Sequence, residues 1–186
     1  CYYNIAKKQI EKNTFSSGWS LGAIVNASDM AGNKLIIATE KNGLLLFDKG
    51  GMFTYNYESY LQSGSINQLL VDREKQVWVA SKKGISRFSE KRFSFINASK
   101  GMMDDDILAV AIDNDNGIWI GTNLGISKIV SDNDGKLVIS KMQGLQKTTI
   151  SCATKAPDGT IWFGTYGKGI VVLSAETKNS VKLLMK

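Results

Sequence analysis

The sequence predicts an all-β protein built from repeated four-stranded units, and three observations lead to this prediction. A strand motif recurs around Trp78, Trp119 and Trp162, with Ile36 at the matching place of a first copy, and the steps are 42, 41 and 43 residues. A glycine follows the motif in every copy: Gly43, Gly84, Gly125 and Gly169. Long helical periodicity is absent. A period of about 40–45 residues with several strands per unit is typical of a β-propeller blade.

The clearest copy of the motif lies in residues 113–129 and has the pattern of a β-hairpin. Asn116 and Gly117 form a turn signal, because glycine readily adopts a positive φ. Ile118 and Trp119 follow as β-branched and aromatic strand residues. The segment therefore predicts a turn, a strand, a second turn at Gly125 and a further strand.

Four full units are expected at residues 18–60, 63–97, 104–140 and 148–185, and residues 1–15 match the last two strands of a unit. In the first two units we expect strands near 22–28, 34–39, 43–48, 52–57, 65–71, 76–81, 84–89 and 92–96. In the last two we expect strands near 106–112, 117–122, 125–130, 136–141, 149–155, 160–165, 169–174 and 180–185. The predicted architecture is four four-stranded blades plus two leading strands.

The first strand of each unit is the most apolar. Residues 107–112 are apolar on both faces, as expected for an inner strand between neighbouring blades. Small residues in the second strands should let adjacent sheets approach closely: Ala38, Ala80, Gly121 and Gly164. Trp78, Trp119 and Trp162 occupy one repeat position, so we expect all three to be buried between blades rather than to bind sugar rings. Cys152 lies in an apolar strand and is expected to be a small core residue.

Composition excludes several kinds of chemistry. The 186 residues contain no His, which removes Ser-His-Asp triads, Cys-His dyads and ordinary zinc sites. The spacing of Asp113, Asp115 and Gly117 is similar to that of a calcium loop, but Leu124 stands where such a loop needs Glu. The formal charge of +6 comes from scattered Lys and Arg, which indicates a solvated surface rather than a nucleic-acid site. No run of eighteen apolar residues predicts a membrane helix, and no cofactor, metal or catalytic residue is predicted.

Ligand contacts are expected in the polar segments that lead into the inner strands. These segments lie at the same end of every blade, so their side chains should converge on one rim. The candidate binding residues are Trp19, Ser65, Asn67, Asp104, Asp106 and Thr149. Asp104 and Asp106 belong to an acidic cluster that is either a ligand or cation contact or a solvated turn, and Trp19 is either a sugar-stacking side chain or a cap over the first unit.

These motifs resemble the two-component regulator propeller repeat. Residues 113–126 match it closely, residues 156–170 nearly as well, and residues 63–88 and 18–47 less well. The resemblance implies a non-catalytic, ligand-sensing segment in the periplasmic region of an inner-membrane hybrid receptor. Such receptors carry a histidine kinase further along the chain and typically sense oligosaccharides derived from glycans. Since these 186 residues contain no His, no phospho-accepting histidine lies among them.

Two other functions remain open from the sequence. A propeller enzyme, such as a lyase or glycosidase, would need ionisable groups clustered on one rim. A scaffold would bind proteins rather than sugars.

The leading strands in residues 1–15 have no blade to complete, because the fourth unit already has all four strands. An open array would expose apolar sides of its end blades, and large apolar patches are seldom exposed on soluble monomers. We therefore expect the chain to be a segment of a larger propeller. Its expected partners are an oligosaccharide and the remaining blades or a second copy, with no nucleic acid and with membrane contact only through the parent receptor.

Overall fold

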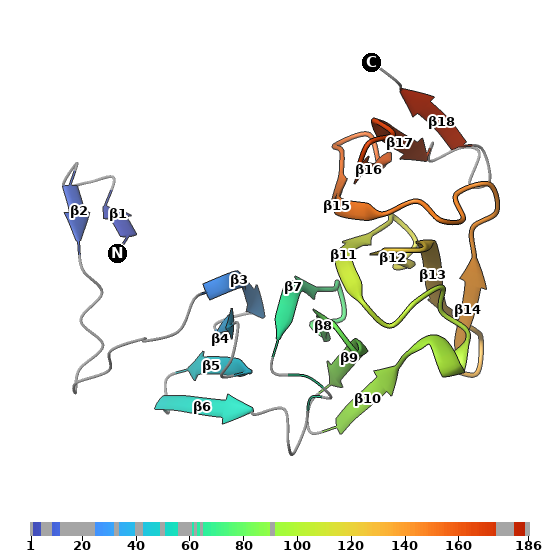
Figure 1. Ribbon diagram of the computed structural model, residues 1–186. Coiled ribbons are helices and arrows are strands. Elements are labelled where there is room, and N and C mark those ends of the chain that lie inside the picture. The colour runs from blue at the N-terminus through green and yellow to red at the C-terminus, as the bar shows by residue number, and fades with distance from the viewer. Residues whose placement is uncertain are drawn as a thin grey trace.

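The structure is a computed structural model of the 186-residue chain, shown in Figure 1. It describes residues 2–4, 9–11, 25–31, 34–39, 43–48, 51–55, 61, 63, 65–89, 92–173 and 181–184. Trp19 lies outside these residues.

The described strands form four antiparallel four-stranded sheets and one short pair, β1 (Tyr2–Asn4) with β2 (Gln9–Glu11). The first sheet contains β3 (Val25–Ala31), β4 (Lys34–Thr39), β5 (Leu44–Asp48) and β6 (Gly51–Tyr55). The second contains β7 (Ile66–Val71), β8 (Val77–Ser81), β9 (Gly84–Ser89) and β10 (Arg92–Ile96). The third contains β11 (Ile107–Ile112), β12 (Ile118–Thr122), β13 (Gly125–Ser131) and β14 (Leu137–Lys141). The fourth contains β15 (Ile150–Lys155), β16 (Ile161–Thr165), β17 (Ile170–Leu173) and β18 (Val181–Leu184).

The all-β prediction of four four-stranded blades and two leading strands is confirmed. The described residues include one 3₁₀ turn, η1 (Ala98–Lys100), and none of their helices is long and apolar enough to cross a membrane. The strand prediction differs most at β3, which begins three residues later than expected. Asp29 lies beyond the predicted strand, but it pairs with Ile36 and the strand continues to Ala31.

Each sheet runs outward from its first strand, and the first strands β3, β7, β11 and β15 lie side by side along the inner side of the array (Figure 1). The buried apolar side chains form three clusters, one between each pair of consecutive sheets. Ile36 and Leu69 belong to the first cluster, Trp78 and Ile107 to the second, and Trp119 and Phe163 to the third.

Gly121 permits a close approach between the third and fourth sheets. A Cβ atom at Gly121 would lie 2.5 Å from Ile150 Cγ2 in the next sheet and 3.1 Å from Ala109 Cβ in its own. Ile150 is fully buried and cannot move away without disturbing the third cluster. The expectation that a small residue brings sheets together is confirmed at this position.

Two burial predictions in the fourth sheet are wrong. Trp78 and Trp119 are 3% and 4% exposed, as expected, but Trp162 is 38% exposed. Cys152 is also exposed. Both residues lie on one side of the fourth sheet, in β15 and β16. In the third sheet the equivalent side is covered by the fourth sheet, but no described element packs against this side of the fourth sheet. The repeat position therefore fixes where the indole lies, while its burial depends on a following sheet.

Candidate functional site

A β-bulge shapes the beginning of every inner strand. The register shifts between Val25 and Ala27, between Ile66 and Gln68, between Ile107 and Ala109, and between Ile150 and Cys152. One residue of each first strand is thus left without a partner in the second strand. A bulge re-aims the side chain of its extra residue, and in the second sheet that residue is Asn67.

Asn67 reaches from the second sheet to the third. Its Nδ2 donates to the carbonyl oxygen of Ile107 at 2.6 Å and to Oδ1 of Asp106 at 3.4 Å. Both acceptors lie where β11 begins. The bulge therefore places a side-chain amide across the junction of two sheets.

The contacts continue from the third sheet to the fourth. Asn123 Nδ2 donates to Asp106 Oδ2 at 3.1 Å, and Thr149 Oγ1 donates to the carbonyl oxygen of Asn123 at 3.3 Å. The backbone N–H of Tyr166 donates to the carbonyl oxygen of Thr149 at 2.9 Å. We call Asn67, Asp106, Asn123 and Thr149 the rim network, because these polar residues connect three consecutive sheets at one end of the array.

The structure brings together three of the six predicted binding residues, Asn67, Asp106 and Thr149. Ser65 and Asp104 make contacts within their own segments instead. The Ser65 N–H donates to Ser63 Oγ at 3.2 Å, and Asp104 Oδ1 accepts the N–H of Asp105 at 2.7 Å. Ligand binding by any of the six residues stays a prediction.

Sequence reasoning missed Asn123 and Tyr166. Each is the first residue of the turn between the second and third strands of its sheet. In both turns the preceding threonine fixes the geometry, since Thr122 Oγ1 donates to Gly125 O at 2.9 Å and Thr165 Oγ1 donates to Gly169 O at 2.7 Å. The sequence contained a signal for both residues. The second strand of each sheet is antiparallel to the first, so the residue that follows the second strand lies beside the start of the first strand, at the rim. Tyr166 is 84% exposed.

The acidic cluster at Asp104, Asp105 and Asp106 is used for hydrogen bonding. Asp105 Oδ1 accepts the N–H of Ala98 at 2.7 Å, and both carboxylate oxygens of Asp106 accept from the rim network. Within the described ranges, no three His, Cys, Asp or Glu side chains lie close enough to hold a metal ion. The rim thus offers amide and hydroxyl donors, a carboxylate acceptor and an exposed aromatic ring.

The opposite end of the third sheet carries a buried polar cluster around Asp113. Trp119 Nε1 donates to Asp113 Oδ2 at 3.0 Å, and Lys128 Nζ donates to the same oxygen at 2.6 Å while lying 4.5 Å from the indole centroid. Burial alone would raise the pKa of Asp113. The hydrogen bonds from Lys128, the Gly117 N–H and Trp119 outweigh burial and hold this pKa below its ordinary value of 3.8.

The second sheet contains the same arrangement with an arginine. Trp78 Nε1 donates to Asp72 Oδ2 at 2.8 Å, and the Arg87 guanidinium lies 5.7 Å from the indole centroid. An acid, an indole and a cation therefore occur together at the hairpin end of two consecutive sheets, and their interactions stabilise the packing and the turn.

Known proteins match this chain in part of its sequence and in its fold. Residues 101–124 and 144–167 match the profile of the two component regulator propeller family. No curated protein matches the chain in sequence.

Among solved structures, the extracellular domain of the hybrid two component system BT3049 from B. thetaiotaomicron is similar with a TM-score of 0.72 and 21% identity, over 90% of this chain and 24% of that one. The corresponding domain of BT4673 from the same organism is similar with a TM-score of 0.71 and 15% identity, over 87% of this chain and 22% of that one.

The structure of virginiamycin B lyase from Staphylococcus aureus, solved as the catalytically inactive H270A variant with quinupristin, is also similar. The TM-score is 0.68 and the identity 14%, over 87% of this chain and 55% of that one. At these identities the likeness concerns the propeller fold. The chain spans about a quarter of the length of the hybrid-system domains.

Proposed function

Since residues 101–124 and 144–167 match the two component regulator propeller family, we propose that the chain is a ligand-sensing propeller segment of a two-component sensor. In this proposal the segment is non-catalytic and lies outside the cytoplasmic membrane, in the periplasm, as part of an inner-membrane receptor. Its ligand is an oligosaccharide bound at the rim.

The observation that carries the proposal is the rim network beside the exposed ring of Tyr166. A sugar hydroxyl both donates and accepts hydrogen bonds, and Asn67, Asn123, Asp106 and Thr149 carry both kinds of group, in hydrogen bonds that a ligand hydroxyl would join or replace. The apolar C–H face of a sugar ring suits an aromatic side chain, and Tyr166 is 84% exposed. The rim thus combines the two kinds of contact that a saccharide needs.

The rim network also suits a sensing role because it joins three sheets. A ligand held by Asn67, Asp106 and Tyr166 would contact the second, third and fourth sheets together. Such a ligand binds best to one relative arrangement of those sheets. Differential binding of this kind shifts a population of conformations, as a receptor requires.

A lyase function is less well supported by these residues. The similar virginiamycin B lyase is described as catalytically inactive when a histidine is replaced by alanine. This chain has no His in its 186 residues. The proposal therefore assigns binding rather than catalysis to the rim.

The proposal also assigns a partner to the outer side of the fourth sheet, where Trp162 and Ile170 are each 38% exposed. This side is equivalent to the side of the third sheet that the fourth sheet covers. A further propeller sheet, from the same receptor or from a second copy of the chain, would bury it.

A glycan array followed by isothermal titration with the oligosaccharide that binds best tests the proposed function. Tyr166→Ala should weaken binding by about tenfold or more, the equivalent of one good contact. Its melting temperature should not change, because the side chain is exposed. Val138→Thr, on the outermost strand of the third sheet, is the matched exposed control and should bind like the parent. The proposal is wrong if no glycan binds saturably, or if both variants bind with parental affinity.

A further inference from the structure

The two ends of the array differ in charge, as the segments that connect the described strands show. At the hairpin end, four described segments contain seven acidic and three basic side chains: residues 72–76, 113–117, 132–136 and 156–160. At the rim end, five described segments contain five lysines and three aspartates: residues 82–83, 97–106, 123–124, 142–149 and 166–169. The rim end is therefore the more basic of the two.

The aspartates of the rim end are consecutive, while its lysines are spread over four segments. The carboxylates of Asp104, Asp105 and Asp106 already accept the hydrogen bonds described above. The rim-end lysines are all exposed: Lys82, Lys83, Lys100, Lys147 and Lys168. The two segments that flank β15 and β17 on the rim side, 142–149 and 166–169, carry lysines and no acid.

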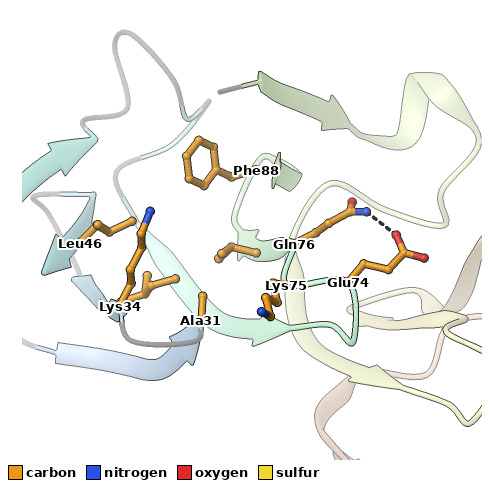
Figure 2. A pocket seen from close by; sticks show the side chains of 9 residues that line it. Ala31, Lys34, Leu46, Glu74, Lys75, Gln76 and Phe88 are labelled. Carbon is orange, nitrogen blue, oxygen red and sulfur yellow. Dashed lines mark hydrogen bonds between the residues drawn. The ribbon is translucent and has the colours of Figure 1, made fainter. Parts of the chain in front are cut away.

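The basic side chains of the hairpin end, by contrast, have acids beside them. Figure 2 shows the hollow between the first and second sheets at that end, where Glu74 and Lys75 belong to one turn. The Glu74 carboxylate accepts a hydrogen bond from Gln76 Nε2 at 2.6 Å. The ion pair that forms within the described ranges, between Lys128 Nζ and Asp113 Oδ2 at 2.6 Å, also lies toward this end. A lysine without an acidic neighbour is thus a feature of the rim.

Lys168 is held beside Tyr166 at the rim. Its Nζ donates to Thr148 Oγ1 at 3.0 Å, and Thr148 is buried. Its backbone N–H donates to Thr165 Oγ1 at 3.2 Å, at the start of the turn that carries Tyr166. Since the Tyr166 N–H donates to Thr149 O, the ammonium group and the backbone of Tyr166 are both attached to residues 148–149.

The Lys168 ammonium group keeps hydrogen-bonding capacity for a ligand. A lysine ammonium has three N–H donors, and the hydrogen bond to Thr148 uses one of them. No carboxylate in the described part of the chain forms an ion pair with it. Because a hydrogen bond between two charged groups is shorter and stronger than one to a neutral hydroxyl, this position favours an anionic group of a ligand over a neutral one.

We propose that the saccharide bound at the rim is acidic, and that Lys168 binds its carboxylate or sulfate group while a sugar ring lies on Tyr166. Lys147, which is exposed in the adjoining segment, adds positive charge. The acidic group lies on the side of Lys168 and away from Asp106. This inference rests on the proposed saccharide site and names the class of saccharide that the site takes.

The test is a glycan array on which acidic oligosaccharides stand beside their neutral counterparts, followed by isothermal titration of the pairs that bind. Tetragalacturonate with its methyl ester represents carboxylates, and the kappa-carrageenan tetrasaccharide with its desulfated form represents sulfates. At least one acidic oligosaccharide should bind saturably, and its neutral counterpart should bind at least about tenfold more weakly. The two pairs also tell a carboxylate from a sulfate.

Lys168→Gln removes the charge and keeps a long polar side chain. It should weaken binding of the acidic oligosaccharide by about tenfold or more and leave binding of the neutral counterpart unchanged. Its melting temperature should not change, because the side chain is exposed.

Lys155→Gln is the matched control, because it removes an exposed lysine from the hairpin end of the same sheet. The six residues of β15 span about 20 Å, which exceeds the Debye length of about 8 Å in physiological salt. This variant should therefore bind like the parent.

The outcomes separate this inference from the proposed function. If neutral oligosaccharides bind as tightly as their acidic counterparts, or if only neutral ones bind, the rim is a saccharide site but the inference is wrong. Equal binding of the acidic oligosaccharide by the parent and by Lys168→Gln would also overturn it. If no glycan binds saturably, the proposed function and this inference both fail.

Discussion

Trp119 Nε1 donates to Asp113 Oδ2 at 3.0 Å, so one carboxylate connects the hairpin turn of the third sheet to a buried indole. The other oxygen of Asp113 accepts the N–H groups of Asp115 at 2.9 Å and Gly117 at 2.7 Å. This residue therefore closes the turn and orients the indole. Trp119 in turn packs edge-on against Phe163 of the fourth sheet, with centroids 6.3 Å apart.

Removing the indole should destabilise the chain strongly. We expect Trp119→Ala to lower the free energy of unfolding by about 3–5 kcal/mol, because it leaves a cavity between two sheets. Denaturant unfolding measures this change. Leu124→Ala is the control, since Leu124 is 46% exposed, and should change stability by no more than about 0.5 kcal/mol. A Trp119→Ala variant as stable as the control would show that the third cluster does not depend on the indole.

Asp113 should make stability depend on pH in the acid range. Its pKa is lower in the folded chain than its ordinary value of 3.8, so the ionised form favours folding. This contribution is fully present above about pH 4 and is lost as pH falls through the folded pKa. Urea unfolding at pH 6 and at pH 3 should therefore show a larger acid loss in the parent than in Asp113→Asn. Identical pH dependence in the two proteins would contradict the role given to this carboxylate.

Much of the fold could be predicted because the same turn and strand residues recur in each copy of the repeat. Asp113, Gly117 and Trp119 give a turn and a strand from local sequence alone, and similar residues recur near Trp78 and Trp162. The repeat position of Trp162 could not by itself predict that its side chain would be exposed, since burial depends on the sheet that follows rather than on the residue. Cys152 was misread for the same reason.

The rim could be predicted only in part. Asn67, Asp106 and Thr149 were found because polar residues stand before apolar inner strands. Asn123 and Tyr166 were missed because their turn looks like an ordinary connection until the end of the second strand is placed beside the start of the first. The bulge that turns Asn67 toward Ile107 has no signature in the sequence of a single repeat. It is seen only in the register of the pairing between β7 and β8.

The approach of the third and fourth sheets should depend on Gly121. We expect Gly121→Ala to cost about 1–3 kcal/mol of unfolding free energy, because its Cβ would lie 2.5 Å from Ile150 Cγ2. In an Ile150→Ala background the same change should cost less. The double-mutant cycle should give a coupling of about 0.5–3 kcal/mol. Additive effects would mean that the two residues do not limit the approach of the sheets.

The outer side of the fourth sheet should drive association of the isolated chain. Gly121 and Ile150 meet where the third and fourth sheets pack together. In the fourth sheet Gly164 occupies the position of Gly121, and in β3 Val25 occupies the register position of Ile150. We therefore expect a second copy to pair end to end through this side. Sedimentation at micromolar concentration should show species larger than a monomer, and Trp162→Lys should shift them to monomer. A parent that remains a monomer would refute this pairing.

A crystal structure of the chain with the oligosaccharide that it binds best would show whether the rim is the binding site. We expect the sugar at the rim, with a ring on Tyr166 and hydrogen bonds to Asn123, Asp106 or Asn67. A sugar bound only at the outermost strands β10, β14 or β18, with the rim unchanged, would contradict it.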